Sequence, residues 1–272
     1  MPSNVIKLNG FAMISKFKNI VITGASSGIG RALAIEFAKK SQNLFLGARN
    51  LENLEQTKNL CKNINDKINI YIKILDVKNE IDCKNWIDEI EKDFAIDLVI
   101  ANAGISAGTA VGVEDYFQIK NIFDTNLYGV INIIQPVIPY MQTRKSGQIA
   151  IISSLASFVS LPSCPSYSAS KSAVRIYGEA LYNSLYEDNV GVNIICPGYI
   201  KTPMTAVNNF KMPFLMEVEY ASKMIIKKLE QNKFLVIFPK RLFLAIKILG
   251  FLPLPIKNFI LRKLPKKPKL IK

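Results

Sequence analysis

Residues 19–30 read NIVITGASSGIG, an apolar run that passes into a glycine-rich turn and then into a segment with helical spacing. A short apolar run bounded by glycine predicts a buried parallel strand. Ile29, Leu33 and Phe37 recur on one side of residues 28–40, which predicts a helix with one buried face. A strand, a glycine turn and a helix in this order predict the first unit of a parallel α/β sheet.

The same alternation continues along the chain. Further strands are expected near 43–47, 68–75, 96–101, 148–153, 190–196 and 233–238. Further helices are expected near 50–64, 79–93, 114–138, 165–187 and 217–230. This pattern predicts a single Rossmann-type α/β fold, a doubly wound parallel sheet of about seven strands with helices on both faces. Ligands of such folds bind beyond the carboxyl ends of the strands.

Length and composition fit one large domain, because 272 residues with 49% apolar residues can bury a sizeable core. The expected organisation is an N-terminal extension at 1–15, a Rossmann-fold domain at 16–240 and an apolar, basic tail at 241–272. No signal peptide is expected, since the first residues lack a long apolar stretch. Whether translation starts at Met1 or Met13 stays open.

Histidine is absent from the sequence. This excludes Ser-His-Asp and Cys-His nucleophile systems and every metal site with His ligands, and we expect no metal. Acid–base chemistry must therefore use Tyr, Lys, Asp, Glu or Cys. The four cysteines contain no CxxC pair, so we expect reduced thiols in a cytoplasmic protein.

The net charge of +14 is unevenly distributed. Eleven of the 35 basic residues lie between Lys233 and Lys272, where no acidic residue occurs, and the other 24 nearly balance 21 acidic ones. This pattern argues against a nucleic-acid binder and favours contact of the tail with an anionic membrane surface. The apolar runs at 241–251 and 258–264 are too short to span a bilayer but suit interfacial helices on its inner face. The alternative is a tail packed on its own domain or on a partner subunit.

The three glycines of the first turn have separate expected roles. Gly24 allows a tight turn off the strand, Gly28 lets the backbone approach a pyrophosphate, and Gly30 permits close packing of helix on strand. The free amides and positive dipole end of the following helix favour an anion here. The spacing is GxxxGxG rather than GxGxxG, so the position of the turn between strand and helix carries the prediction of a dinucleotide site.

A second motif, YSASK at 167–171, begins a predicted helix. Tyr167 and Lys171 are four residues apart and share a helix face. We expect the Lys171 ammonium to lower the pKa of Tyr167 from about 10 toward the working pH, because a nearby cation favours the phenolate. Ser154 ends a predicted strand thirteen residues before Tyr167, so both hydroxyls can reach one substrate oxygen. Ser153 should point to the other face of that strand.

Together, the GxxxGIG turn, Ser154 and the YxxxK pair resemble the short-chain dehydrogenase/reductase family over residues 19–202. The resemblance implies an oxidoreductase that interconverts a carbonyl and an alcohol with a nicotinamide cofactor. Ser154 would orient the carbonyl, Tyr167 would be the general acid/base, and Lys171 would also bind the nicotinamide ribose. Asn126 matches the fourth catalytic residue of the family, which would interrupt its helix and hold a water linking Lys171 to solvent. The alternative for Asn126 is an exposed polar residue.

The resemblance also implies the cofactor contacts. Asp76 would hold the adenine with help from the Val77 backbone, Asn102 would steady the sheet, and Thr202 would bind the carboxamide. Asp76 is alternatively a helix cap, the turn ending at Thr202 is alternatively an ordinary turn, and Ala101 departs from the usual Asn. The expected contacts are Gly24, Ser26, Ser27, Gly28, Ile29, Gly30, Arg49, Asp76, Val77, Asn102, Ala103, Gly104, Tyr167, Lys171, Pro197, Gly198, Ile200 and Thr202.

The end of the second strand indicates which nicotinamide cofactor is preferred. An acidic residue there would bind the ribose 2′-hydroxyl of NAD, but this strand ends at Arg49. An arginine can clamp a 2′-phosphate, and in the resembled family it marks NADP preference. We expect NADP(H), with NAD(H) less favoured. Ser27 stands where some NADP-dependent members carry a basic residue, and a solvated Arg49 is the alternative.

Residues 203–216 lie where the family carries a substrate lid. Its apolar side chains, among them Met204 and Phe210, predict a lipophilic carbonyl or alcohol, or alternatively an ordinary packed lid.

The resemblance also implies a homodimer or homotetramer through the helices near 114–138 and 165–187. Two other functions stay open: a cofactor-binding sensor without turnover, and a membrane-associated scaffold acting through its tail. The complete set of four catalytic residues favours the enzyme.

Overall fold

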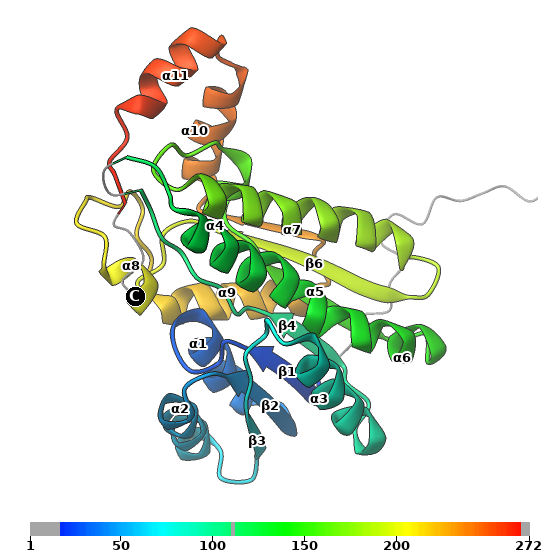
Figure 1. Ribbon diagram of the computed structural model, residues 1–272. Helices are drawn as coiled ribbons and strands as arrows, with labels where there is room; N and C mark the ends of the chain where they lie inside the picture. The colour runs from blue at the N-terminus through cyan, green and yellow to red at the C-terminus, as the bar shows by residue number, and fades with distance from the viewer. Residues whose placement is uncertain (1–16, 110–111, 268–272) are drawn as a thin grey trace, which may run out of the picture.

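The computed structural model describes residues 17–109 and 112–267. The expected N-terminal extension at 1–15 lies outside these residues, as does the end of the tail. The strands are β1 (Asn19–Thr23), β2 (Asn43–Ala48), β3 (Asn69–Ile74), β4 (Leu98–Ala101), β5 (Gly147–Ile152), β6 (Val190–Pro197) and β7 (Leu235–Phe238). They form one parallel sheet in the order β3-β2-β1-β4-β5-β6-β7, which confirms the predicted fold class (Figure 1).

Helices connect successive strands and cover both faces of the sheet (Figure 1). The longer ones are α1 (Gly28–Ala38), α2 (Leu51–Ile64), α3 (Glu80–Asp93), α4 (Tyr116–Phe123), α7 (Pro165–Ser184), α9 (Val218–Glu230), α10 (Lys240–Phe251) and α11 (Leu254–Arg262). Shorter helical segments are η1 (Asp124–Tyr128), α5 (Gly129–Ile134), η2 (Gln135–Val137), α6 (Ile138–Thr143), η3 (Leu155–Phe158) and α8 (Pro203–Ala206).

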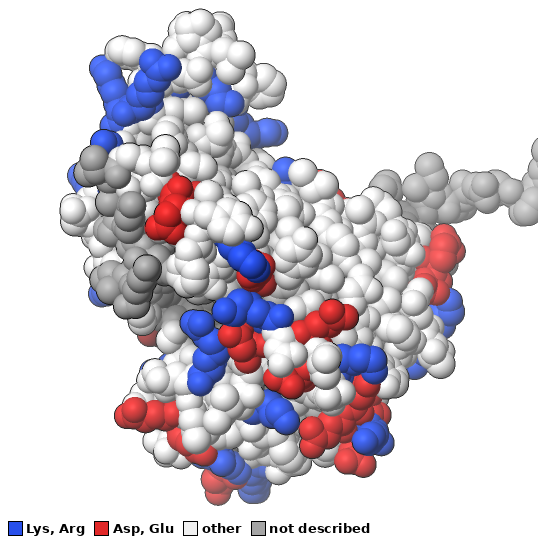
Figure 2. Space-filling view, in the orientation of Figure 1, with Lys and Arg blue, Asp and Glu red and all other residues white. Residues whose placement is uncertain are grey.

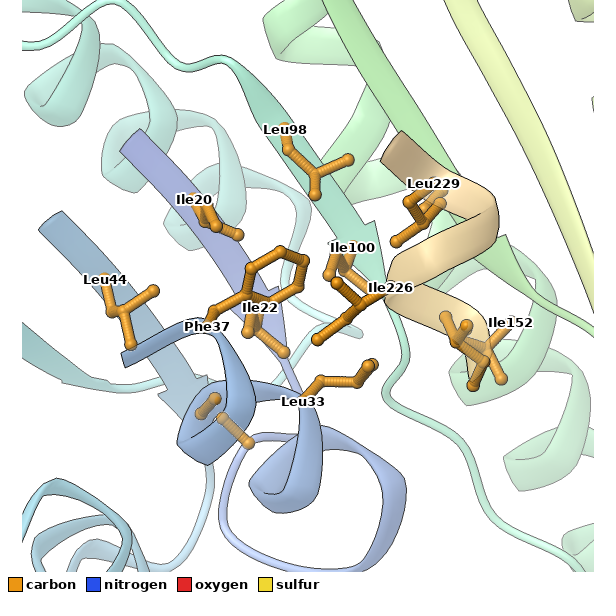
Figure 3. Packing of buried hydrophobic residues seen from close by; sticks show 14 of the residues in the cluster. Ile20, Ile22, Leu33, Phe37, Leu44, Leu98, Ile100, Ile152, Ile226 and Leu229 are labelled. Atoms are coloured by element: carbon orange, nitrogen blue, oxygen red, sulfur yellow. The ribbon is translucent and has the colours of Figure 1, made fainter. Parts of the chain in front are cut away.

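Two hydrophobic clusters hold the layers together. Ile20 and Ile22 of β1 point into a cluster with α1, α2 and α9, while Val21 between them points into a cluster with α3, α5, α6 and α7. Figure 3 shows the first cluster, where Leu33 and Phe37 of α1 lie over the strands. Alternate strand residues thus face opposite layers, and both faces of the sheet are buried.

The order of the strands positions the site. β1 lies between β2 and β4, so successive crossovers run in opposite directions from the centre of the sheet. The loops after β1 and β4 therefore diverge and leave a crevice at their carboxyl ends.

The helix expected over 114–138 differs most from the prediction. It runs from Tyr116 to Thr143 but is broken by the π-helical turn η1 and the 3-10 turn η2. Pro136 lies in η2 and Pro139 follows it at the start of α6. Both interrupt the helix because proline lacks the amide that an uninterrupted helix needs. The η1 break contains Asn126, as expected from the resemblance.

The tail also differs from the prediction in detail. Pro255 lies in the first turn of α11 and starts this helix earlier than expected, because a proline is tolerated where helix amides have no internal partner. α10 and α11 project together from one end of the molecule (Figure 1). Within the described residues, no helix combines the length and apolar character needed to cross a bilayer.

Candidate active site

A cleft of about 660 Å³ lies at the carboxyl ends of the strands. The loops that follow β1 through β6 all contribute to its walls. The expected site residues that line it are Gly24, Ser26, Ser27, Gly28, Ile29, Arg49, Asp76, Val77, Asn102, Ala103, Gly104, Ser154, Tyr167, Lys171, Pro197, Gly198, Ile200 and Thr202. Gly30 and Asn126 do not line the cleft but contact residues that do.

The glycine turn has little room for side chains. Gly24 and Gly28 have φ angles of 65° and 52°, a region that favours glycine. A Cβ on Gly24 would lie 2.8 Å from the Cα of Ala103, and a Cβ on Gly30 would lie 2.3 Å from the carbonyl oxygen of Gly24. Gly30 therefore lets α1 pack against the turn itself, rather than against the strand as expected. Ser27 caps α1 without a side-chain hydrogen bond to the first amides.

Two side chains hold this turn in place. Asn102 Nδ2 donates to the carbonyls of Thr23 and Gly24, at 2.9 and 3.2 Å, and ties the end of β4 to the end of β1. Arg31, which the sequence reasoning missed, donates to the carbonyl of Ser26 and to Thr57 Oγ1 on α2. An arginine on α1 looks like an ordinary surface residue in the sequence, so no local signal marked it.

Arg49 and Asp76 also line the cleft. They directly follow β2 and β3. Arg49 is exposed, and Asp76 accepts a hydrogen bond from the Lys78 amide at 3.1 Å. The alternative role of Asp76 as a helix cap is wrong, because Asn79 caps α3 by accepting from the Asp82 amide.

The three reactive side chains lie together. The hydroxyl of Ser154 interacts with that of Tyr167, and Ser154 Oγ accepts from the Ala156 amide at 3.1 Å. Lys171 is buried one turn further along α7, and its Nζ donates to the carbonyl of Ile152 at 2.9 Å. Ser153 points elsewhere, since its hydroxyl donates to the backbone carbonyl of Lys171.

The ionisation of this pair differs from the expectation. Desolvation by the surrounding protein raises the pKa of Tyr167 to about 12, more than the interaction with Ser154 lowers it. Burial likewise lowers the pKa of Lys171 to about 8. The expected lowering of the Tyr167 pKa by Lys171 is therefore wrong for this arrangement, because desolvation dominates and Lys171 is not among the groups that shift this pKa.

Asn126 is fully buried in the η1 turn, so its alternative as an exposed residue is wrong. Its amide side chain pairs with the backbone of Ile105, with Oδ1 accepting at 2.8 Å and Nδ2 donating at 2.9 Å, and Nδ2 also donates to Ser170 Oγ. A Cβ on Gly104 would lie 3.2 Å from Asn126 Oδ1 and 3.4 Å from Lys171 Nζ. Asn126 thus braces the loop after β4 beside Lys171.

The turn after β6 and the segment that follows it form another wall of the cleft. A Cβ on Gly28 would lie 3.3 Å from the side chain of Thr202, so this turn approaches the phosphate-binding turn. A parallel bridge between Ile200 and Met216 joins the two ends of the expected lid. Of the lid residues, Pro203, Met204 and Thr205 line the cleft, whereas Phe214 and Leu215 line a separate pocket beside β7.

Several lining residues escaped the sequence reasoning although they adjoin expected ones. They are Ala48, Asn50, Leu75, Ile105, Thr125 and Ile152. The most informative is Thr125, whose buried hydroxyl has no hydrogen-bond partner among the described residues. The sequence could have indicated Thr125 as a site residue, because it directly precedes Asn126.

The cleft fits a dinucleotide. Gly24 and Gly28 line the cleft without side chains, the N-terminus of α1 offers amides to a pyrophosphate, and Thr125 offers a hydroxyl that has no partner among the described residues. Lys171 and Tyr167 line the same cavity as this turn, so a dinucleotide seated on the turn can extend toward them.

Comparison with known proteins agrees with this geometry. The short chain dehydrogenase family matches residues 18–212. An uncharacterized oxidoreductase of Myxococcus xanthus is 32% identical over 249 residues, which cover 91% of this chain and 98% of that protein. The 11-beta-hydroxysteroid dehydrogenase-like 2 of Arabidopsis thaliana is 38% identical over 192 residues, which cover 69% of this chain and only 61% of that protein.

A solved structure shares the fold. A short chain dehydrogenase/reductase from Burkholderia phymatum, in complex with NAD, aligns with a TM-score of 0.78 at 22% identity and covers 94% of this chain and 99% of its own. The family match over most of the chain, the relatives and the parallel seven-stranded sheet agree with one another. The chain therefore belongs to the short-chain dehydrogenase/reductase family of oxidoreductases, which act on CH–OH and carbonyl groups.

Proposed function

We propose that this chain interconverts a carbonyl and an alcohol with NADP(H), and that Tyr167 is the general acid/base. One observation carries the proposal: the hydroxyls of Tyr167 and Ser154 and the ammonium of Lys171 line the same cleft as the glycine turn. The competing functions, a sensor without turnover and a membrane-bound scaffold, give no reason for this set of side chains to converge on one cavity.

The residues have separate roles in the proposed reaction. A nicotinamide cofactor held at the glycine turn would supply the hydride for carbonyl reduction, or take it up in alcohol oxidation. Ser154 donates its hydroxyl proton in a hydrogen bond to the carbonyl oxygen. Tyr167 transfers its phenolic proton to the same oxygen as negative charge develops there. Lys171, which lines the same cleft, would hold the nicotinamide ribose, and Asn126 holds the loop after β4 in position.

The proposed preference for NADP(H) rests on Arg49, an exposed cation in the cleft wall after β2. A 2′-phosphate can accept charge-assisted hydrogen bonds from its guanidinium, whereas the hydroxyl of NAD(H) cannot neutralise it. Hydrogen bonds to charged groups contribute about 2 kcal/mol, which corresponds to roughly thirtyfold in affinity.

Replacing Arg49 by Asp should reverse this preference. We expect the wild-type chain to oxidise NADPH faster than NADH with a panel of lipophilic aldehydes and ketones, and Arg49→Asp to lower the ratio of the two kcat/KM values at least tenfold. Lys78→Asp is the matched control. It also replaces a cation by a carboxylate near Asp76, but Lys78 does not line the cleft. An unchanged ratio in Arg49→Asp would refute the cofactor preference, and no turnover with any member of the panel would refute the enzyme.

The proposed substrate is lipophilic. Met204 and Ile105 bring apolar surface to the cleft near the reactive hydroxyls. The name of the Arabidopsis thaliana relative, which refers to a hydroxysteroid, points in the same direction. The carbonyl panel should therefore rank apolar compounds above small hydrophilic ones of equal reactivity.

We also propose that the protein is cytoplasmic and that α10 and α11 lie on the inner face of an anionic membrane. Their exposed apolar side chains include Leu244, Ile248, Phe251, Leu254, Ile256 and Phe259. Basic side chains lie among them, and no acidic residue follows Glu230 in the sequence. At this end of the molecule Figure 2 shows basic atoms without acidic ones, whereas both kinds mix over the opposite end. Apolar and basic groups together suit an anionic lipid interface.

A charge placed in this surface should weaken membrane binding. Phe251 is 85% exposed, and Phe251→Glu is expected to lower partitioning onto vesicles that contain phosphatidylserine at least fivefold, because a carboxylate opposes both burial and charge attraction. Ile81→Glu on α3 is the control, since Ile81 is 70% exposed on another part of the surface. Equal partitioning of the two variants, measured by vesicle sedimentation, would contradict membrane association.

A homodimer or homotetramer is proposed through the α4–α5 and α7 helices. Tyr116, Tyr128 and Ile176 are exposed apolar side chains on these elements. Burying them against a second copy would remove apolar surface from water in the isologous manner of two-fold oligomers.

A further inference from the structure

The C-terminal tail reaches back to the reactive tyrosine. Lys267 Nζ donates to Ser106 Oγ on the loop after β4 and lies 5.4 Å from the centre of the Tyr167 ring. The backbone of Lys267 packs against Gly108, where a Cβ would lie 2.3 Å from the Lys267 carbonyl oxygen. Cys164, at the start of α7, is close enough to interact electrostatically with this ammonium. Lys267 thus contacts the loop after β4 and lies beside the ring of Tyr167.

The path of the chain holds this lysine in place. Phe243 of α10 packs on Phe158 of η3, with ring centres 5.0 Å apart, directly after Ser154. The chain then passes through α11 and returns to the loop after β4 (Figure 1). The start of α10 and the chain after α11 therefore both contact loops of the active site. Lys267 is the last residue after α11 that the structure describes.

This contact differs from those of the other tail lysines. Lys247 and Lys263 lie over Phe243 and Phe259, each only four residues away in its own helical segment. Lys267 instead lies over a ring that is 100 positions distant in the sequence. Helical spacing explains the first two contacts but not the third.

Among the residues that the structure describes, the Lys267 ammonium has no anionic partner. It forms no ion pair within the described part of the chain, and the carboxylate of Glu114 instead accepts from the Ser166 amide at the start of α7. Desolvation lowers the pKa of Lys267, which means that its surroundings penalise the charge. A desolvated cation gains most from an anionic partner that arrives with its own negative charge.

We propose that Lys267 is a specificity-determining residue that completes the substrate side of the active site from the C-terminal tail and binds a carboxylate on the carbonyl substrate. The inference rests on the proposed function and adds an anionic end to its lipophilic substrate. Because Lys267 lies beside the Tyr167 ring, the carboxylate is separated from the reacting carbonyl by only a few bonds. Ser106 orients the ammonium through its hydroxyl.

The test compares a charged ligand with its neutral ester. The three isomers of formylbenzoate and their methyl esters are titrated calorimetrically into the full-length protein saturated with NADP+, where no hydride is present and the aldehydes remain bound unreduced. The wild-type protein should bind at least one carboxylate about tenfold more tightly than its ester. Lys267→Met should abolish this preference and Lys267→Arg should retain most of it. Lys266→Met is the matched control, since Lys266 is an exposed neighbour of the same charge, and should change the ratio less than twofold.

The outcomes separate this inference from the proposed function. Equal binding of every acid and ester by the wild-type protein, no binding of any isomer, or an unchanged ratio in Lys267→Met would each overturn the role of Lys267. A Lys267→Met variant that melts at a lower temperature but keeps the ratio would reveal a latch that only stabilises the tail. Absence of NADPH oxidation, in contrast, would refute the proposed reaction and leave the binding ratios intact as evidence for the anion site.

Discussion

Tyr167→Phe should lower kcat for carbonyl reduction by about a thousandfold, within the range that a positioned general acid contributes. The substitution removes the hydroxyl proposed to transfer its proton to the substrate oxygen, whereas Ser154 only forms a hydrogen bond with that oxygen, and it keeps the ring beside the cofactor cleft. NADPH affinity, measured by fluorescence titration, should change less than about twofold.

The pH dependence offers a second measurement on the same residue. With a pKa of about 12, the Tyr167 phenol stays protonated near neutral pH and is ready to donate a proton in reduction. Alcohol oxidation needs the phenolate, whose fraction rises with pH below the pKa, so the wild-type oxidation rate should rise between about pH 7 and pH 9.

A matched control is available on the same helix. Tyr177 of α7 also uses its hydroxyl in a hydrogen bond, with Gln135, but lies outside the cleft wall. Tyr177→Phe should keep wild-type kcat and its pH profile. A Tyr167→Phe enzyme that reduces carbonyls at the wild-type rate would refute the assignment of the general acid.

Gly30→Ala is expected to have the largest effect on the cofactor site. Its Cβ would lie 2.3 Å from the carbonyl oxygen of Gly24 and 2.6 Å from Asn102 Nδ2, and the first of these is backbone that cannot rotate away. We expect a loss of about 1–3 kcal/mol in the free energy of unfolding, the usual cost of overpacking. The displaced turn should also weaken NADPH binding more than tenfold.

Gly250→Ala is the control for this substitution. Gly250 also lies in a helix, α10, but a Cβ there meets no atom within 4 Å. The variant should be as stable as the wild type or slightly more stable, because alanine favours helix by up to about 1 kcal/mol. Urea unfolding and NADPH titration of both variants check the pair, and wild-type NADPH affinity in Gly30→Ala would contradict the role given to this glycine.

Most elements followed from local patterns. β1 occupies the predicted residues 19–23, and α7 begins at the predicted Pro165, because apolar periodicity, glycine turns and proline act over neighbouring residues. The convergence of Ser154 and Tyr167 could also be predicted, since both were placed after strands of one parallel sheet. The breaks between α4 and α6 could not be located from periodicity. The η1 turn depends on the pairing of Asn126 with Ile105 and Ser170, which lie far from it in the sequence.

Charge states required the folded chain. The YxxxK spacing places Lys171 one turn from Tyr167, but spacing carries no information about how much water the fold removes from both groups. Burial moves the pKa of the tyrosine up to about 12 and that of the lysine down to about 8. The direction expected for Tyr167 was therefore wrong, because desolvation is a property of the whole assembled site.

The sequence alone determined the order of the strands and helices, the glycine turn and the identities of the reactive groups, since each is written in short-range patterns. The tertiary structure decided which chemically identical residues differ in role. Lys266 and Lys267 are adjacent lysines in one basic run, yet the first is exposed and the second lies over the ring of Tyr167. Packing of α10 on η3 and the return of the chain after α11 make that difference, because contacts between distant segments exist only once the fold has closed.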